Sequence, residues 1–559
     1  MITAIGLIGR TWVPVGDEAV IVLRTSQIGS TDTPLVGVYS THGWSHPGPI
    51  LYWLLAPAYF VSNGNPSALL FTSLLLNTAG VAALAVAAWR LGGRRLLTIT
   101  GFFLLLLIHG LRPELLLQIW NPYVPLIAFG LFLFTTWGIA AGSNRWLWAG
   151  IALGSALVQL HVAYLPLVGS AGVTVVGLRW ALRRTVTTRP NRRQLLTAAA
   201  VFLILWVAPA LDLVFGDRQT WKLVRYFAAG SSGSIGYARG AGILSNHLSP
   251  FGPWSVGTEV SVFGNVVGGS LFWLALVLVA LTISASWAFV TKRPQVAIPA
   301  ILCVIQVTVG VAAASRLEEP VLSYLVVWML PLAMFVWLVL LWSLVHLIDA
   351  LVGTRATQHA SAFRLGSIGA QVAAVALIAG PLSATLRAAP KAPLPRAEFR
   401  GVVEHIAPKV ATSVGTGPVR IEGIGDDFQE GWVGVLFALD RDGVPFFTSD
   451  GYTGQKWGRS HRWRGQQVNT SLSVVVSLPT RYSDPVAICD LDVGLTKIAE
   501  YDRLSAASRA ELKALQVDNY TTRGELSFTQ RQRLSRLTRS GYRMAVYSGD
   551  HICAVTPGR

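Results

Sequence analysis

The sequence predicts a polytopic α-helical membrane protein that carries a soluble α/β domain at its C-terminus. Of its 559 residues, 52% are hydrophobic and only 13% are charged, and the mean hydropathy is +0.51. Soluble proteins of ordinary composition contain about 25% charged residues, so most of this chain requires a bilayer around it. The composition changes near residue 389, where a Pro-rich stretch leads into a segment of mixed polarity.

Ten apolar segments approach the ~20 residues that cross a hydrocarbon core of ~30 Å. They lie at residues 67–89, 96–111, 118–141, 146–160, 163–179, 196–215, 268–290, 296–315, 321–348 and 365–386. The apolar stretch 50–61 is shorter and lies between HPGP and NGNP, so we expect a helix in the membrane interface. The N-terminal MITAIGLIG is also too short to span, and we expect that most of a first transmembrane helix is missing ahead of it.

The distribution of charge predicts the orientation of the membrane domain. Every second loop is basic, and together these loops hold 14 of the 23 Lys and Arg residues of positions 1–389; the opposite loops hold nine of the ten acids. Basic loops are typically cytoplasmic, so a large loop over 13–66 is predicted to be extracytoplasmic. The net charge of +17 therefore belongs mainly to the membrane part. No soluble segment has a basic stripe with interleaved aromatics, which argues against a nucleic-acid partner.

Three parts follow from these patterns: a membrane domain over 1–388, a linker over 389–402 and an extracytoplasmic α/β domain over 403–559. In the last part we predict strands at VRIEGI, PFFTS, SLSVVVSL, MAVYS and ICAVTP, and helices over 428–440, 504–516 and 527–539. Cys489 and Cys553 are its two cysteines. They form a disulfide if this part faces an oxidising compartment, and are otherwise two buried thiols.

Two adjacent carboxylates, Asp17 and Glu18, begin the outer loop. Acids beside a membrane are costly and mark functional sites by default; the alternative is a pair of solvated loop acids. Arg24, His46 and Arg112 lie in the same outer loops, where they can bind phosphate or act as interfacial anchors. Polar residues near them are expected to contact the substrate: His42, Glu114 and Asn121.

The order VGDEA, HPGPILYWLLAP and the following hairpin of spans resembles the GT-C superfamily of membrane glycosyltransferases. The branch that it resembles contains protein O-mannosyltransferases and lipid A aminoarabinose transferases. The resemblance covers residues 13–180 by pattern and the rest by topology. It implies that Asp17 is the catalytic carboxylate, with Glu18 beside it, and that Arg24, His46 or Arg112 binds the donor phosphate. Where relatives often have a second acid or a lysine, near HPGP, this chain has His46.

The implied reaction is inverting transfer of a sugar from a polyprenyl-phosphate donor to an extracytoplasmic glycan, glycolipid or protein. An Asp base on the acceptor hydroxyl is worth ~10²–10⁴ in rate, and cations stabilise the departing phosphate. No metal-binding motif such as HExxH occurs, so a metal-independent reaction without a cofactor is favoured over one using a divalent ion. The sequence names neither the sugar nor the acceptor.

Two other functions remain open. A transporter or flippase of lipid-linked sugars would carry charges near the bilayer midplane, whereas here they lie at the outer ends of the spans. A non-catalytic membrane scaffold would instead present the C-terminal domain, whose aromatic residues we expect to be exposed and to suit glycan or protein binding (Trp432, Trp457 and Trp463).

Overall fold

The chain folds into two compact units. A computed structural model describes residues 6–553 apart from 41, 184–188, 231–232, 258–263, 354–382, 385–386, 388–391, 426–428, 450, 478–484 and 522–525. Unit 1 comprises Met1–Arg10, Leu35–Ala58 and Ala68–Pro393, and unit 2 comprises Thr11–Pro34, Tyr59–Ser67 and Leu394–Arg559. The division differs from the boundary expected at 388, because the start of the predicted outer loop folds with the C-terminal residues.

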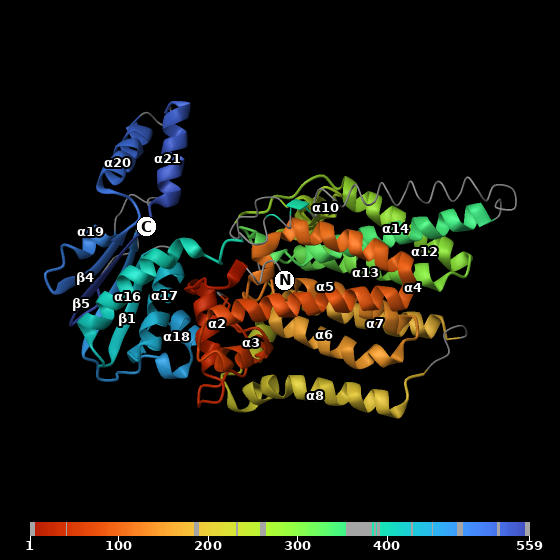
Figure 1. The fold of residues 1–559 in the computed structure, drawn as a ribbon, viewed down its shortest axis with the longest axis horizontal. Helices are drawn as coiled ribbons and strands as arrows, with labels where there is room; N and C mark the ends of the chain where they lie inside the picture. The colour runs from red at the N-terminus through yellow and green to blue at the C-terminus, as the bar shows by residue number, and fades with distance from the viewer. Residues whose placement is uncertain are drawn as a thin grey trace. The chain divides into compact units, whose positions relative to one another are not determined.

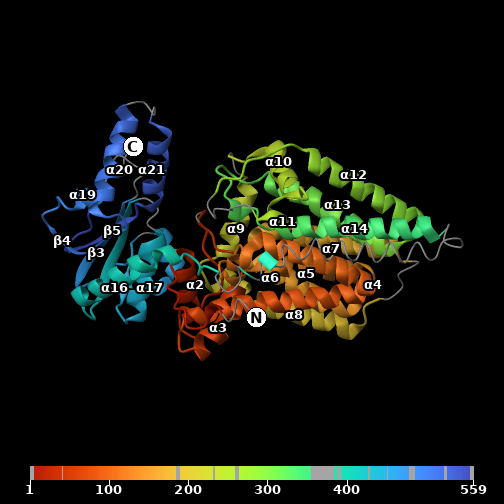
Figure 2. The same ribbon diagram turned by 45° about the horizontal axis from the view of Figure 1, so that its top comes forward.

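Unit 1 is a bundle of apolar helices that run alongside one another (Figures 1 and 2). The bundle contains α4 (Ser67–Leu117), α5 (Pro125–Ala140), α6 (Leu147–Leu160), α7 (Leu165–Ala181), α8 (Arg192–Phe215), α12 (Phe272–Val290), α13 (Pro294–Ala314) and α14 (Met329–Gly353). Aromatic side chains such as Phe129, Trp137 and Phe335 fill its interior. Among the described residues, six helices are long and apolar enough to cross a membrane: those in α4, α7, α8, α12, α13 and α14. Unit 1 is therefore a multi-pass membrane unit, as predicted.

Helix α4 is long enough for two spans. Its apolar portion, Ser67–Arg112, has 46 residues and would be about 69 Å long as one straight helix, more than twice the ~30 Å hydrocarbon core. Gly93 interrupts it with φ 64° and ψ −155°, a conformation that suits glycine because it has no Cβ. The predicted spans 67–89 and 96–111 are thus separated by a short break at Gly93.

Two other predicted spans form helices that are too short to cross a bilayer. A helix was predicted over 118–141, but residues 121–124 form turns and α5 begins only at Pro125. Helix α6 has 14 residues, fewer than the ~17 that a membrane span requires. The tenth predicted span, 365–386, lies almost wholly outside the described residues. The 12-residue helix predicted at 50–61 is confirmed as α3 (Ile50–Val61).

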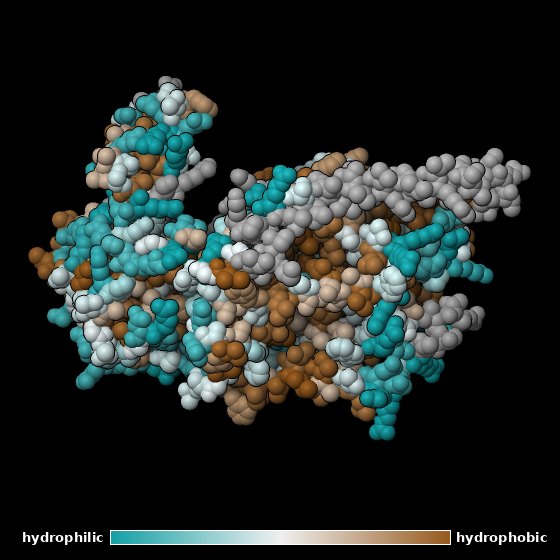
Figure 3. Space-filling view, viewed as in Figure 1, coloured by the Kyte–Doolittle hydropathy of each residue, from teal (hydrophilic) through white to brown (hydrophobic). Residues whose placement is uncertain are grey.

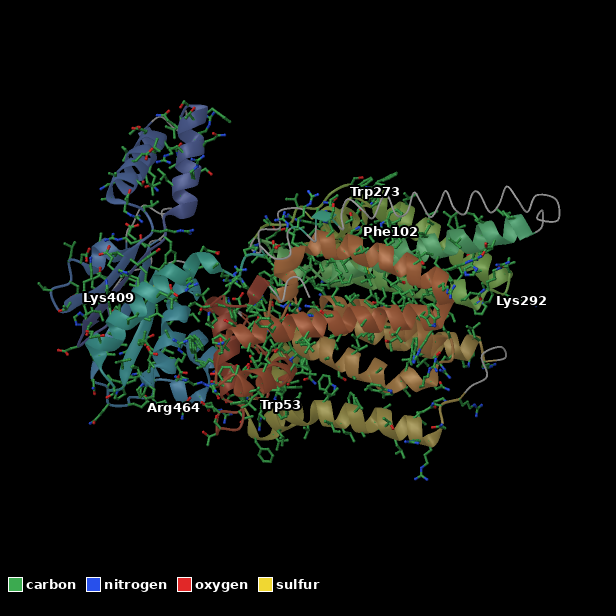
Figure 4. The ribbon with its side chains drawn as sticks, in the orientation of Figure 1. Trp53, Phe102, Trp273, Lys292, Lys409 and Arg464 are labelled. Carbon is green, nitrogen blue, oxygen red and sulfur yellow. A yellow bond between two sulfur atoms is a disulfide. The ribbon has the colours of Figure 1, made fainter. Side chains whose placement is uncertain are left out.

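Most of the described acidic residues of unit 1 gather at one end of the bundle. At the opposite end Arg95 pairs with Asp349 (Nη1–Oδ2 2.6 Å). Lys292 lies at this end too, whereas Trp53 of α3 lies at the other end (Figure 4). Hydrophobic residues cover the middle of the bundle, and hydrophilic residues gather near Lys292 (Figure 3). We call the end with Trp53, which also carries α9 (Gln219–Ala229) and Glu318, the acidic end.

Unit 2 is built on a five-stranded sheet of order β2-β1-β3-β5-β4. The strands are β1 (Val419–Gly425), β2 (Phe446–Phe447), β3 (Thr470–Ser477), β4 (Leu495–Asp502) and β5 (Arg543–Gly549). Strand β1 pairs in parallel with β2 and β3, whereas β5 is antiparallel to β3 and β4. The central strand β3 is buried from Ser471 to Ser477, as expected for a strand that is covered on both faces.

Helices pack around this sheet and connect its strands. The N-terminal helix α2 (Gly16–Ser26) packs on α17 (Gln429–Arg441), and α17 packs on α16 (Arg400–Val414). Between β4 and β5, α20 (Ala506–Thr521) and α21 (Phe528–Ser540) form a hairpin. A small core of Leu512, Leu515 and Leu537 holds the two helices together.

The predicted α/β domain is confirmed in most of its elements. Strands β1, β2, β3 and β5 and helices α17, α20 and α21 lie where the sequence predicted them. Strand β4 was missed because its sequence, LTKIAEYD, is half-exposed and charged. The strand predicted at ICAVTP is wrong for Ile552 and Cys553, which are irregular; the rest of it lies outside the described residues.

Cys489 and Cys553 form a disulfide, with Cα atoms 5.9 Å apart. The bond lies in a buried apolar cluster with Val475, Val486 and Tyr547, so it connects the end of the chain to helix α19 (Pro485–Cys489) beside the sheet. Of the two alternatives left open by the sequence, the disulfide is the one observed. Cys303 remains a buried free thiol.

We expect the disulfide to contribute about 2–4 kcal/mol to the stability of unit 2. The test is thermal unfolding of the full chain in detergent, followed by tryptophan fluorescence. Dithiothreitol should lower the unfolding temperature of the wild type but leave that of a Cys489→Ser/Cys553→Ser variant unchanged. Equal behaviour of the two proteins with and without reductant would contradict this expectation.

Candidate functional site

Helix α2 presents the predicted acid pair. Asp17 and Glu18 lie in its first turn and Arg24 in its last, the arrangement that the helix dipole favours at both ends. Successive residues of a helix point in different directions. The two carboxylates therefore meet different surroundings, although they are neighbours in the sequence.

Asp17 is paired with a lysine from the C-terminal part of unit 2. Its Oδ1 accepts a hydrogen bond from Nζ of Lys456 at 2.8 Å. The Lys456 side chain is 6% exposed and that of Asp17 is 25% exposed. Lys456 belongs to α18 (Gly451–Trp457), 439 residues along the chain. The carboxylate is thus accessible on one side and neutralised on the other.

Glu18 is buried and faces an arginine. Its side chain is 1% exposed, and its Oε2 lies 3.2 Å from Nε of Arg396. Neither carboxylate oxygen accepts a hydrogen bond from the described residues, so the geometry is that of a close charge pair. Burial raises the pKa of Glu18, while the charge of Arg396 opposes this rise. A carboxylate so enclosed is poorly placed to meet a substrate.

Arg24 lies within unit 2 as well, against an acid of the same loop. Its Nη1 donates to Oε1 of Gln27. Burial alone would raise the pKa of Asp32, but hydrogen bonds from Ser460 and the charge of Arg24 lower it. Part of the positive charge of Arg24 is therefore already balanced by Asp32.

His46, predicted to bind phosphate, is buried in unit 1. Its Nδ1 accepts the Val162 N–H at 3.1 Å, and its ring centroid lies 4.7 Å from that of His161. Burial and the neighbouring His161 hold the pKa of His46 well below its usual value. His46 is consequently neutral, and it can offer a phosphate a hydrogen bond but no charge.

The remaining predicted residues divide into exposed and structural ones. Arg112 is exposed and sits at a second break in α4, with φ 60°. Glu114 is half-buried, and within the described part of the chain neither residue forms a hydrogen bond or ion pair with a side chain. Asn121 is 3% exposed and donates to the Leu160 carbonyl at 3.1 Å, which fastens the turn before α5 to the end of α6.

A polar cluster that the sequence did not single out surrounds His42. The Tyr226 hydroxyl lies 3.2 Å from Nδ1 of His42 and donates to Oε1 of Glu318, also at 3.2 Å. Trp44 packs beside both rings. His42 alone was predicted, because Tyr226 of helix α9 and Glu318 of the loop before α14 are distant from it in the sequence, and no local pattern reveals their contact.

Comparisons with known proteins identify the fold. No protein-family model and no curated protein matches the sequence. The structure is similar to that of ArnT from Cupriavidus metallidurans bound to undecaprenyl phosphate, with a TM-score of 0.51 and 15% identity. The fold is GT-C-like. The match covers 89% of this chain and 94% of the ArnT chain, and ArnT in the apo state matches with a TM-score of 0.50 and 14% identity.

The described residues contain no group of three or more His, Cys, Asp or Glu side chains placed to hold a metal ion.

We expect the Asp17–Lys456 pair to stabilise unit 2 by roughly 1–3 kcal/mol, because breaking a partly buried charged hydrogen bond leaves one charge without its partner. A double-mutant cycle with Asp17→Asn and Lys456→Met should give a coupling free energy in this range. Thermal unfolding of the full chain in detergent provides the measurement. Lys409→Met, on the exposed face of α16, is the matched control and should have no effect; additive effects of the first two changes would refute the pairing.

The buried Glu18 predicts a pH dependence. Because its folded pKa is raised above the ordinary 4.5, its contribution to stability is complete below that value and is lost as pH rises through the folded pKa. The unfolding free energy of the wild type relative to Glu18→Gln should therefore fall as the pH rises above about 4.5. Glu404→Gln, in an exposed pair with Arg400, should show no such trend. A difference that stays constant with pH would exclude a raised pKa.

Proposed function

We propose that this protein is a membrane glycosyltransferase that transfers a sugar from a polyprenyl-phosphate donor to an extracytoplasmic acceptor. The observation that carries the proposal is the similarity to ArnT, whose structure holds undecaprenyl phosphate, over nearly the full length of both chains. ArnT is an aminoarabinose transferase of the GT-C type. The acceptor is a cell-envelope glycan, glycolipid or protein.

Asp17 is the proposed general base. It takes the proton from the acceptor hydroxyl, whose oxygen forms the new bond to the anomeric carbon as the bond to the phosphate oxygen breaks. The polyprenyl phosphate leaves as an anion, so no acid is required on that side. Lys456 supports this role by holding one carboxylate oxygen in place, because a base must be oriented as well as ionised.

Arg112 is the proposed ligand of the donor phosphate. It is exposed, and its neighbour along α4, Glu114, makes no ion pair with it within the described residues. A guanidinium binds phosphate oxygens in bidentate fashion. Arg24 and His46 have weaker support as phosphate ligands, because Asp32 balances part of the charge of Arg24 and burial keeps His46 neutral.

We further propose that the acidic end of unit 1 and the C-terminal domain face the extracytoplasmic side. The basic residues of the opposite end support this orientation through the usual bias of cytoplasmic loops. The Cys489–Cys553 disulfide supports it independently, because structural disulfides persist in oxidising compartments.

The decisive variant is Asp17→Asn, assayed in purified membranes with a panel of lipid-phosphate sugars. If Asp17 is the base, transfer should fall about 10²- to 10⁴-fold, while the protein remains folded by thermal unfolding. Glu404→Gln is the control for loss of an acid in the same unit and should transfer at the wild-type rate. Unchanged transfer by Asp17→Asn would remove Asp17 from catalysis.

One observation favours a second candidate, a non-catalytic scaffold that presents unit 2. The ion pair with a buried lysine is also what a purely structural aspartate would form. In that case Asp17→Asn and Lys456→Met would lower the unfolding temperature alike, and the wild type would transfer none of the sugars in the panel. The sequence-based expectation of exposed aromatic residues for such a scaffold is wrong for Trp432 and Trp457, which are buried.

A further inference from the structure

The acidic end of unit 1 holds a cluster of aromatic and polar side chains that we call the His42 cluster: His42, Trp44, Tyr226, Phe227 and Glu318. Its members come from three segments. His42 and Trp44 lie in a hairpin held by the Ser40 N–H to the Trp44 carbonyl at 2.7 Å and the Gly37 N–H to the His46 carbonyl at 2.9 Å. Tyr226 and Phe227 belong to α9.

Glu318 reaches the cluster from the loop before α14. Its backbone forms a bridge with Ser234, and the Ile235 N–H donates to the Leu317 carbonyl at 2.8 Å. Backbone hydrogen bonds between the segment of Ser234 and that of Glu318 therefore hold the main chain that carries the carboxylate. This order is what a preformed binding site requires.

The inner side of the cluster is apolar and its outer side is accessible. Trp44, Val162 and Leu223 form a buried core beneath it, while His42 is exposed and Phe227 is 47% exposed. The ring centroids of Trp44 and Phe227 lie 5.9 Å apart. The indole N–H of Trp44 is buried and has no hydrogen-bond partner among the described residues.

The hydrogen bonds determine which groups remain free for a ligand. The Tyr226 hydroxyl donates a hydrogen bond to Glu318. Its oxygen therefore accepts a hydrogen bond from Nδ1–H of His42. Glu318 then keeps a second carboxylate oxygen, and the Tyr226 oxygen can accept a further hydrogen bond beside it. The cluster therefore offers acceptors beside aromatic faces. Sugar hydroxyls, which are donors, match these acceptors, whereas a phosphate, which is an anion, is repelled by Glu318.

Helix α9, which carries Tyr226 and Phe227, has the residue pattern of a helix that lies at a bilayer surface. Trp221, Val224 and Phe227 are 54%, 49% and 47% exposed and recur every third residue, while Leu223 packs inward. Lys222 and Arg225 are exposed beside the apolar stripe. An apolar stripe with basic flanks is typical of a helix in the headgroup region, and α9 follows the spanning helix α8 after only Gly216, Asp217 and Arg218.

We propose that the His42 cluster is a subsite for the saccharide head of a lipid-linked sugar, with Glu318 and Tyr226 binding its hydroxyls and Phe227 packing against its ring. The proposal rests on the proposed transferase function for the identity of the lipid-linked ligand. The substrate's sugar is bound here, and its phosphate is bound elsewhere, because the cluster carries a carboxylate.

The test measures saccharide binding to the purified full chain in detergent without any donor lipid. The probes are methyl α-D-mannopyranoside and methyl β-D-arabinofuranoside, followed by saturation-transfer NMR. At least one glycoside should bind the wild type, and Glu318→Gln and Tyr226→Phe should each weaken binding about tenfold by loss of one hydroxyl contact. Glu319→Gln is the matched control, because the neighbouring acid pairs with Arg239 (2.7 Å) and should change binding less than about twofold.

A substitute variant and a competition with phosphate complete the test. Phe227→Ala alters only a partly exposed ring and replaces Tyr226→Phe in the test if that variant does not fold. It should also weaken glycoside binding. Inorganic phosphate should not displace the glycoside. Absence of glycoside binding to the wild type, equal binding by Glu318→Gln, or displacement by phosphate would each overturn the subsite. These results are separate from the transfer assay, so loss of the subsite leaves the transferase proposal standing, and a failed transfer assay leaves saccharide binding measurable.

Discussion

The cost of placing charge in hydrocarbon is the constraint on which this structure depends. It keeps the described spanning helices of unit 1 apolar and collects ionisable groups at their ends. The Arg95–Asp349 pair lies at one end, and Glu318, Glu319 and the basic helix α9 lie at the other. A lipid-linked substrate has the same division, an apolar tail and a polar head. Polar chemistry for such a substrate has to be located where these helices end.

The cost of burying an unpaired charge also explains how helix α2 is held in unit 2. The acids of α2 are neutralised by Lys456 and Arg396, which lie far along the chain. These pairs join the N-terminal helix to the sheet domain, so the first acidic segment is a structural part of unit 2, although the sequence predicted it in the membrane domain. In the transferase that we propose, one residue serves both purposes: Asp17 is held by Lys456 and remains partly exposed, whereas Glu18 is fully enclosed.

The sequence predicted elements whose signal is local. Apolar length revealed the spans, and alternation or continuous apolar runs revealed β3 and β5. It did not predict β4, whose charged residues pack at a sheet edge, nor the shortening of the span expected at 118–141, where turn geometry prevailed over hydropathy. Of the site, His42 was predicted, but Tyr226, Glu318 and Lys456 were not. Their roles depend on contacts between segments that are distant in the sequence, and a single sequence carries no record of such contacts.

The proposed mechanism requires that a polyprenyl phosphate binds at the acidic end of the helical bundle. Photo-crosslinking with a diazirine-bearing undecaprenyl phosphate, followed by peptide mapping, can detect such binding. We expect labelled peptides that contain Arg112 and residues of α9, with labelling suppressed by unlabelled undecaprenyl phosphate. Labelling confined to the basic end, around Arg95 and Lys292, or labelling that the unlabelled lipid does not suppress, would contradict this expectation.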